Sequence, residues 1–217
     1  MPVLDEAAGI AAMLQMLAPL RARGAEVIVV DGGSRDGTPE LAAPLADRVL
    51  VSARGRARQM NAGAAQATAD VLLFLHADTH LPEAADQHIA AALRDGAGWG
   101  RFDVRISGRP WMLRVVAACM NLRSRLTGIA TGDQALFVRR ALFQQVGGYP
   151  DQPLMEDVEL SRRLRRVAPP ACLRETVVTS GRRWESRGVW RTIVLMWRLR
   201  WRYWRGESPD SLARAYR

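Results

Sequence analysis

The strongest constraint on the fold of this chain is the alternation of short apolar runs with helical patterns over its first hundred residues. Three apolar runs predict strands: residues 27–30 and 71–75, which have the composition of strands buried on both faces, and the short run 48–51 between them. Between them lie segments with helical spacing or helix-start signals: residues 6–23, Thr38-Pro39 and residues 56–68. Strands that alternate with helices predict an α/β fold with a mostly parallel central sheet and helices on both faces.

The rest of the chain continues this mixture with longer helices. Helices are predicted at residues 82–94, 111–126, 141–146, 156–167 and 189–205, and strands at residues 98–106, 134–138 and 173–179. A length of 217 residues suits one domain of this kind. The two cysteines, Cys119 and Cys172, lack metal-ligand spacing and fit a reducing compartment. We therefore expect a single domain.

Acidic residues stand where predicted strands end. Asp31 follows the first apolar run, Asp78 follows the third, and Glu156-Asp157 begins a helix after a loop rich in Gly and Pro. In open α/β sheets, ligands bind beyond the carboxyl ends of the strands. Carboxylates crowded there need compensation, and Mg²⁺ or Mn²⁺ shared with a substrate phosphate supplies it. Each acid alone fits a turn or a cap equally well. Together they favour a ligand site.

These motifs and their order resemble those of family 2 glycosyltransferases, which have the GT-A fold. The stretches that carry the resemblance are Pro2–Glu6, Val29–Thr38, Asn61–Gly63, Phe74–Asp78, Gly132–Phe137, Gly147–Tyr149 and Met155–Leu160. The chain is especially similar to the small bacterial subgroup described as transferase 2, radical-SAM/selenodomain-associated. The resemblance implies transfer of a sugar from a nucleotide-diphosphate donor to an acceptor hydroxyl, with inversion at the anomeric carbon, and we expect a lipid-like acceptor.

The resemblance also implies roles for individual residues. Asp157, or Glu156 beside it, would be the base that deprotonates the acceptor hydroxyl. Asp78 would bind a metal and the donor diphosphate as the last acid of an Asp-x-Asp motif, with His76 as the other metal ligand. The remaining donor-binding residues would be Asp5, Glu6, Asp31, Asp133, Arg183 and Trp184. The chain would then comprise a nucleotide-binding half (1–108), an acceptor and catalytic half (109–180) and a basic, Trp-rich helical tail (181–217).

Three positions depart from the family pattern. The chain starts at Met1-Pro2, where family members have an apolar strand, so we expect the first, central strand to be missing and the true start codon to lie upstream. His76 replaces the first acid of Asp-x-Asp. Because imidazole suits softer metals than Mg²⁺, His76 is either a metal ligand or a partner of the phosphate. Ser180 stands where the Gln of a Gln-x-x-Arg-Trp motif would precede Arg183 and Trp184.

Two arginines raise a further choice. Arg56 and Arg58 lie on the helix predicted before the third apolar run. Either side chain would reach the donor phosphates, and we include Arg58 among the donor-binding candidates. A solvated helix face explains both arginines equally well.

The C-terminal tail is strongly basic. Residues 182–217 carry ten arginines against three acids, which is a net charge of +7 out of +9 for the chain. The helix predicted at 189–205 has two apolar stripes: Trp190, Ile193, Val194, Trp197, Trp201 and Trp204 on one side, and Leu195, Met196, Leu199 and Tyr203 on the other. One stripe would dock on the domain and the other would meet an anionic membrane surface or a partner. A helix wedged within the protein is the alternative. Without a nucleic-acid module, no nucleic-acid partner is expected.

The start of the chain lacks the pattern of a signal peptide, and no apolar run approaches the ~20 residues that span a bilayer. We therefore expect a cytoplasmic protein that attaches to the inner face of the cell membrane. Beside the glycosyltransferase, two other functions are considered. One is a sugar-1-phosphate nucleotidyltransferase, although the Gly-rich basic loop of such enzymes is not visible. The other is a non-catalytic protein that binds a nucleotide sugar or a membrane surface.

Overall fold

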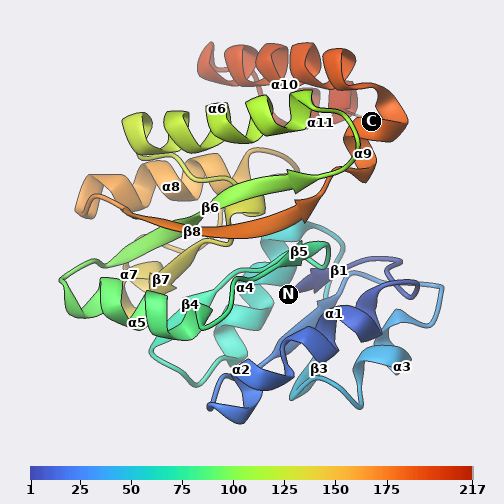
Figure 1. Cartoon of the computed structure of the whole chain (residues 1–217), viewed down its shortest axis with the longest axis vertical. Helices are drawn as coiled ribbons and strands as arrows, with labels where there is room; N and C mark the ends of the chain where they lie inside the picture. Colours follow the sequence, from blue (N-terminus) through green and yellow to red (C-terminus); the bar gives the residue numbers. More distant parts are fainter. Residues whose placement is uncertain (217) are drawn as a thin grey trace.

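The computed structural model describes residues 1–216 and contains two sheets in one α/β arrangement (Figure 1). The first sheet has the order β1-β2-β3, and all its strands are parallel: β1 (Pro2–Val3), β2 (Ile28–Asp31) and β3 (Arg48–Val51). The second has the order β4-β7-β6-β8-β5: β4 (Val71–Leu73), β7 (Phe137–Arg139), β6 (Trp99–Ser107), β8 (Ala171–Ser180) and β5 (Thr79–His80).

The predicted parallel sheet is confirmed for the first sheet and needs correction for the second. In the second sheet β6 pairs in parallel with β8, whereas β7 runs antiparallel to β4 and β6, and β5 runs antiparallel to β8. The periodicity of a segment identifies a strand, but it does not determine the direction of the neighbour with which that strand pairs. A mixed sheet is therefore the observed centre of this half.

Helices cover both sheets. In the first half they are α1 (Ile10–Met16), α2 (Ala18–Ala22), α3 (Thr38–Ala42), α4 (Arg56–Gln66) and α5 (Ala85–Arg94). In the second half they are α6 (Met112–Thr127), the 3₁₀ turn η1 (Gly132–Gln134), α7 (Arg140–Gln145), α8 (Glu156–Val167), α9 (Arg182–Arg187), α10 (Val189–Trp204) and α11 (Pro209–Tyr216). Figure 1 shows α6 and α8 above the long strands β6 and β8, with α10 and α11 forming the uppermost layer.

Most predicted elements form, and the differences have local causes. The helix predicted at 6–23 is divided at Leu17, because Pro19 lacks the N–H that would continue α1. The strand predicted at 134–138 begins only at Phe137, because Gly132–Gln134 forms a 3₁₀ turn that ends at Ala135 with a φ of 47°. Strand β5 and helices α9 and α11 were not predicted from the sequence.

The first strand is short, but it is not missing. Pro2 and Val3 pair in parallel with Val30 and Asp31, and the Met1 amine donates a hydrogen bond to the Ile28 carbonyl at 2.8 Å. The strand position that was predicted to be empty is therefore partly filled, because these two residues pair with the backbone at the end of β2. A mainly apolar cavity of about 200 Å³ lies beside them, lined by side chains from both β2 and β4.

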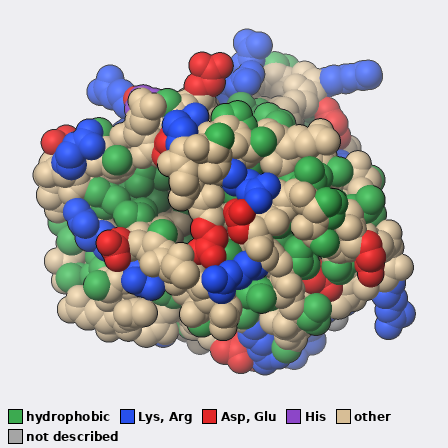
Figure 2. Space-filling view, turned by 90° about the horizontal axis from the view of Figure 1, so that it is seen from below, with side chains coloured by type: hydrophobic (Ala, Val, Ile, Leu, Met, Phe, Trp, Pro, Cys, Tyr) green, Lys and Arg blue, Asp and Glu red, His purple; other side chains and the backbone are tan. Residues whose placement is uncertain are grey.

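The charge of the molecule is distributed unevenly over its surface. On the lower face, acidic and arginine side chains lie interspersed among apolar ones (Figure 2). The arginine-rich α10 lies at the opposite side of the molecule, in the uppermost layer of Figure 1. Within residues 1–216, none of the helices has the length and apolar character needed to cross a membrane.

Candidate active site

A cavity of about 770 Å³ lies where α6, α8 and α10 meet the segment after β4 and the η1 turn. Its polar lining comprises Arg56, His76, Arg123, Asp133, Asp157 and Arg200. Its remaining lining is mainly apolar and comes from α6, α10 and the segment before α8. Polar groups therefore gather at one part of a cavity that is otherwise hydrophobic.

Helix α8 separates the two predicted candidates for the base. Adjacent residues on a helix point about 100° apart, so Glu156 and Asp157 cannot share one environment. The Asp157 side chain lines the cavity, and its Oδ2 accepts a hydrogen bond from the Gly132 amide at 2.8 Å. The first turn of α8 stabilises a carboxylate, and the Val158 amide donates to Asp157 Oδ1 at 2.7 Å. Of the two acids, Asp157 is therefore the one whose side chain faces the cavity.

Glu156 points instead into the protein, where it pairs with Arg56. The Arg56 Nε lies 2.9 Å from Glu156 Oε1, and the glutamate side chain is 4% exposed. Burial raises the pKa of Glu156 above its usual value even though the Arg56 charge acts in the opposite direction. The other oxygen, Oε2, is buried and has no hydrogen-bond partner among the described residues. Glu156 thus depends on Arg56 for its charge compensation.

His76 and Asp133 form the opposite side of the polar region. His76 Nδ1 lies 3.7 Å from Asp133 Oδ1. The imidazole lies so close to Gly132 that a Cβ at this position would be 2.4 Å from His76 Cε1, which explains why glycine precedes Asp133. Burial opposes ionisation of Asp133, but His76 and the charges of Arg56 and Arg183 outweigh it and hold the pKa of Asp133 below its usual value. Asp133 is therefore a carboxylate in a basic environment.

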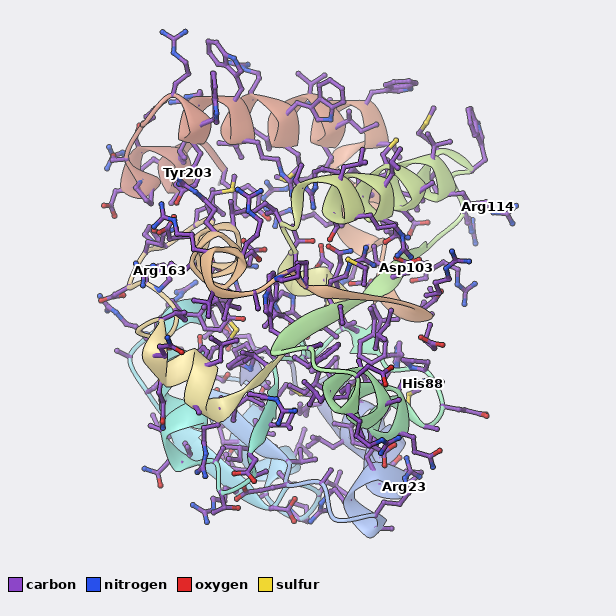
Figure 3. The ribbon with its side chains drawn as sticks, turned by 90° about the vertical axis from the view of Figure 1, so that its left-hand side faces the viewer. Arg23, His88, Asp103, Arg114, Arg163 and Tyr203 are labelled. Atoms are coloured by element: carbon purple, nitrogen blue, oxygen red, sulfur yellow. The ribbon has the colours of Figure 1, made fainter. Side chains whose placement is uncertain are left out.

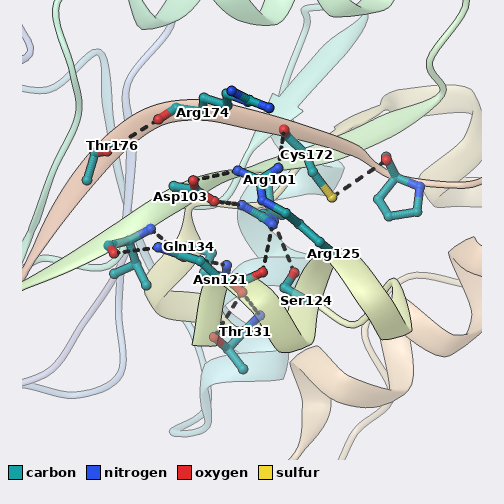
Figure 4. Close-up of polar contacts among 12 residues, drawn as sticks. Arg101, Asp103, Asn121, Ser124, Arg125, Thr131, Gln134, Cys172, Arg174 and Thr176 are labelled. Carbon is teal, nitrogen blue, oxygen red and sulfur yellow. Dashed lines mark hydrogen bonds and ion pairs between the residues drawn. The ribbon is translucent and has the colours of Figure 1, made fainter. Parts of the chain in front are cut away.

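A network of buried polar contacts positions this region (Figure 4). Asn121 on α6 exchanges two hydrogen bonds with the backbone of Val104 on β6, at 2.8 and 3.0 Å. Arg101, which is fully buried, donates to Ser124 on α6 at 3.0 Å and pairs with Asp103. Thr131 and Gln134 form a capping box around η1, so the turn that carries Asp133 has a defined shape.

The loop that precedes α8 is held by another family motif. Asn61 on α4 donates to the Tyr149 carbonyl at 2.8 Å and accepts from the Tyr149 amide at 3.0 Å. These bonds connect the Asn61–Gly63 motif with the Gly147–Tyr149 motif. Both motifs therefore have a structural explanation, because they fix the loop that leads to Glu156 and Asp157.

Several predicted donor-binding residues lie outside the cavity, in the loops after β1 and β2. Asp31 is 2% exposed and accepts hydrogen bonds from the amides of Gly33 and Ser34 at 2.8 and 2.9 Å. Asp5 accepts from the Arg35 amide at 2.9 Å. Both carboxylates thus stabilise turns, which is the structural role that the sequence left open for each acid. Neither carboxylate is among the residues that line the cavity.

Glu6 and Asp78 lie near each other at this edge of the protein. Burial raises the pKa of Glu6, Arg182 at 3.9 Å opposes this shift, and the Asp78 charge adds to it. Asp78 receives one long hydrogen bond, 3.4 Å from the Thr79 hydroxyl, so its oxygens have capacity for a further ligand. The structure thus places His76 with Asp133 and places Asp78 with Glu6.

The pair Arg183-Trp184 lies on α9. Trp184, which was predicted to bind the donor, lines the cavity. The Arg183 guanidinium stacks on the Tyr216 ring, 3.8 Å from its centroid, and hydrogen-bonds the Tyr216 hydroxyl. Burial lowers the pKa of Arg183. Helix α11 therefore contributes Tyr216 to the cavity, a contact that the sequence did not indicate.

The two arginines of α4 have different positions. Arg58 pairs with Asp151 at 2.8 Å on the exposed surface and does not line the cavity. Arg56 lines the cavity and holds Glu156. Sequence reasoning also missed Arg123. The detectable signal was its position on the apolar face of α6, at helical spacing from Met112, Val116 and Met120.

A divalent cation has no site built from protein side chains alone. No group of three or more His, Cys, Asp or Glu side chains in residues 1–216 is arranged to hold a metal ion. Mg²⁺ in transferase sites commonly takes one or two carboxylates and completes its shell with substrate phosphates and water. Asp78 has oxygens with capacity for a further ligand and Asp133 is ionised, so either carboxylate suits such a cation, and the structure places the two in different side-chain clusters.

The arrangement of sheets and helices is the GT-A fold, as its similarity to solved structures shows. The chain is similar to Staphylococcus aureus TarS 1–349, with a TM-score of 0.64, 19% identity and coverage of 83% of this chain and 59% of TarS 1–349. It is similar to the mannosyltransferase PcManGT from Pyrobaculum calidifontis, solved with GDP-Man and Mn²⁺, with a TM-score of 0.60, 22% identity and coverage of 99% and 67%.

The sequence comparison identifies the family. Residues 1–143 match the family model described as glycosyl transferase family 2, and the chain belongs to this family of enzymes. The chain is also 25% identical over 206 residues to the protein named "Probable glycosyltransferase YdaM" of Bacillus subtilis strain 168. That match covers 84% of this chain and 48% of the relative, so the chain spans about half the length of the curated relative it matches. The family is the one that the sequence motifs indicated, and the subgroup is not resolved.

Proposed function

We propose that this protein is an inverting glycosyltransferase that moves a sugar from a nucleotide-diphosphate donor to an acceptor hydroxyl. The observation that carries the proposal is the Asp157 carboxylate, which lies in the cavity beside the polar residues and is held by the Gly132 amide at 2.8 Å. A hydroxyl is a weak nucleophile until a positioned carboxylate accepts its proton. Asp157 supplies that carboxylate, while Glu156 is committed to Arg56.

Charge stabilisation on the donor side supports the same reaction. The leaving diphosphate gains negative charge in the transition state, so cations that face it lower the barrier. Arg56 and Arg183 lie close enough to Asp133 to lower its pKa, so two cationic side chains are available beside this carboxylate. We assign the diphosphate to this region. Asp31, Asp5 and Glu6 belong to the loops that would enclose the nucleoside, and Trp184 would contact the acceptor.

A divalent cation fits this proposal. Glucosyl-3-phosphoglycerate synthase from Mycobacterium tuberculosis, which covers 82% of this chain at 18% identity with a TM-score of 0.59, was solved with Mn²⁺ and UDP-glucose. For this chain we propose that one carboxylate, from Asp78 or Asp133, binds the cation together with the donor phosphates, and that His76 is either a second ligand or a partner of the phosphate. When bound, the cation would neutralise the diphosphate.

A donor panel tests the function. Purified protein is incubated with UDP-, GDP- and dTDP-sugars, Mg²⁺ or Mn²⁺ and a set of hydroxyl acceptors, and released nucleoside diphosphate is measured. We expect acceptor-dependent release that EDTA suppresses at least about tenfold, because the cation shares the diphosphate charge. NMR of the product should show inverted anomeric configuration. A product with retained configuration would contradict the role of Asp157 as base in a direct displacement.

We further propose that α10 attaches the enzyme to an anionic membrane surface. Its inner side packs on α11 and the loop before α8 through Leu199, Leu195 and Tyr203. Its outer side is exposed, with Trp201 at 58% and Trp204 at 80%, and Figure 3 shows ring-bearing side chains projecting outward from this helix. A wedged helix would not leave these rings exposed. Exposed tryptophans interleaved with arginines suit the interface of an anionic bilayer.

The double substitution Trp201→Ser and Trp204→Ser should weaken co-sedimentation with vesicles of anionic phospholipid by at least about tenfold, because two aromatic rings no longer enter the interface. Neither residue lines the cavity, so activity on a water-soluble acceptor should persist. Val51→Ser, at an equally exposed apolar residue of β3 (77%), is the control and should bind like the wild type. Wild-type protein that stays in the supernatant would refute the membrane proposal.

A further inference from the structure

The apolar part of the cavity is a channel between two helices. One side is the face of α6 that carries Met112, Val116 and Met120, and the other is the face of α10 that carries Ile193, Met196 and Trp197. Figures 1 and 3 both show α10 lying over α6. From Met112 to Arg123 the wall formed by α6 extends about 16 Å at the helical rise of 1.5 Å per residue. This length and a volume of about 770 Å³ admit an apolar chain.

Arg123 lies at the end of this apolar wall, in the polar part of the cavity. Its Nε and Nη2 atoms are buried and have no hydrogen-bond partner among the described residues. Burial lowers the pKa of Arg123, whereas the Asp157 charge opposes that shift, so the guanidinium lies near the proposed base. Arg56, by contrast, has Glu156 at 2.9 Å. Arg123 is thus a cavity arginine whose hydrogen-bonding capacity the fold does not use.

A buried guanidinium without hydrogen-bond partners costs free energy, and a protein retains such a group when a ligand completes it. The planar donors of Arg match the oxygens of a phosphate or carboxylate in pairs. A neutral hydroxyl compound would leave Nε and Nη2 unsatisfied, whereas an anion would satisfy both. Charge complementarity therefore selects an anionic ligand, and the adjacent channel selects one with an apolar chain.

We propose that the acceptor is an anionic amphiphile whose phosphate or carboxylate binds Arg123 and whose apolar chain lies between α6 and α10. The inference rests on the proposed transferase function for its reaction. The same head group carries the hydroxyl that faces Asp157. The hydroxyl oxygen bonds to the anomeric carbon, the bond from that carbon to the diphosphate oxygen breaks, and its electron pair leaves with the nucleoside diphosphate. The hydroxyl proton passes to Asp157.

Binding without a donor tests the assignment directly. Two anionic probes, 3-hydroxydodecanoate and dodecylglycerol phosphate, are compared by titration calorimetry with their neutral counterparts, the methyl ester and dodecylglycerol, below the concentrations at which they form micelles. The two anions distinguish a carboxylate from a phosphate. We expect at least one anion to bind at least about tenfold more tightly than its neutral counterpart, the usual scale for a charged hydrogen bond.

Variants of α6 identify the residue responsible. Arg123→Gln should remove the tenfold preference, and Arg123→Lys should keep part of it because the charge remains. Arg114→Gln removes the same charge from the same helix at an exposed residue outside the cavity, and it should bind like the wild type (Figure 3). Thermal melting checks the fold, and Arg123→Gln should not lower the melting temperature because no internal hydrogen bond at Nε or Nη2 is lost.

The outcomes separate this inference from the proposed function. Equal binding of anions and neutral counterparts, or an anion preference that survives Arg123→Gln, overturns the role of Arg123. In transfer assays, Arg123→Gln should raise KM for the acceptor about tenfold with KM for the donor unchanged. The reverse pattern would place the donor diphosphate on Arg123. Anion binding as predicted with no nucleoside diphosphate released from any donor would sustain the binding site and refute the transferase reaction.

Discussion

Replacing Asp157 with Asn is expected to lower kcat by about 10²- to 10⁴-fold, the usual contribution of a positioned general base. The amide keeps the size of the side chain and can still accept from the Gly132 amide, so the helix start should remain intact. It cannot accept the acceptor proton. Donor affinity should change little, because Asp157 faces the cavity from the acceptor side. Steady-state kinetics with saturating donor and acceptor measure the effect.

Glu159→Gln is the matched control for this experiment. Glu159 belongs to the same first turn of α8 and loses the same charge, but it pairs with Arg162 and Arg163 and does not line the cavity. Its kcat should stay within about twofold of the wild type, as expected for a surface charge. Glu156→Gln completes the set. A large loss of kcat in that variant with activity preserved in Asp157→Asn would transfer the base to Glu156.

The replacement Arg56→Met is expected to destabilise the protein by about 3 kcal/mol, because it leaves the Glu156 carboxylate buried without its partner. The glutamate side chain is 4% exposed. Arg56 contacts its Oε1, and its Oε2 has no hydrogen-bond partner among the described residues. Urea unfolding at neutral pH measures the loss. The double variant Arg56→Met with Glu156→Gln should recover most of it, because the charge that needs compensation is then gone.

The pH dependence of the Arg56→Met variant has a defined sign. Burial already raises the pKa of Glu156, and removal of the Arg56 charge raises it further. An acid whose pKa is raised in the folded state binds its proton more readily there than in the unfolded chain. The loss of stability is therefore largest at pH values above the folded pKa, and it disappears as the pH falls below the pKa of the unfolded chain. Arg58→Met, which breaks an exposed ion pair on the same helix, should lower the free energy of unfolding by less than about 1 kcal/mol both above and below the pKa of Glu156. Equal losses for Arg56→Met and Arg58→Met would contradict the buried role of Arg56.

The sequence predicted the fold because apolar spacing reports burial. Helix α8 forms over the predicted residues 156–167, β3 coincides with the predicted run 48–51, and β2 lies one residue further along the chain than the predicted run 27–30. What periodicity cannot report is the partner of a polar side chain. Arg56 and Arg58 stand two residues apart on α4, yet one holds a buried glutamate and the other a surface aspartate. Only the tertiary structure separates them.

The same limit explains the distribution of the candidate site. Asp31, Asp78 and Asp157 were predicted together because each follows or begins a regular element. The structure brings Asp157 to the cavity with His76 and Asp133, whereas Asp31 is occupied by its own turn. Tyr216 reaches Arg183 from a helix at the far end of the chain, and no local pattern encodes such a contact. Arg123 could have been predicted from the sequence, because it lies at helical spacing from the apolar residues Met112, Val116 and Met120 of α6.

The two walls of the cavity differ in how firmly the fold holds them. Helix α6 is anchored by Asn121 and Ser124 to buried polar groups of β6, whereas α10 buries only Thr192 and Leu199 fully. Local opening requires least free energy where few buried contacts must break. A bulky chain that enters the cavity would therefore displace α10 rather than α6. The cavity would then widen for its acceptor only on the side of α10. The groups that carry out the chemistry would keep their relative positions, because α6 would not move.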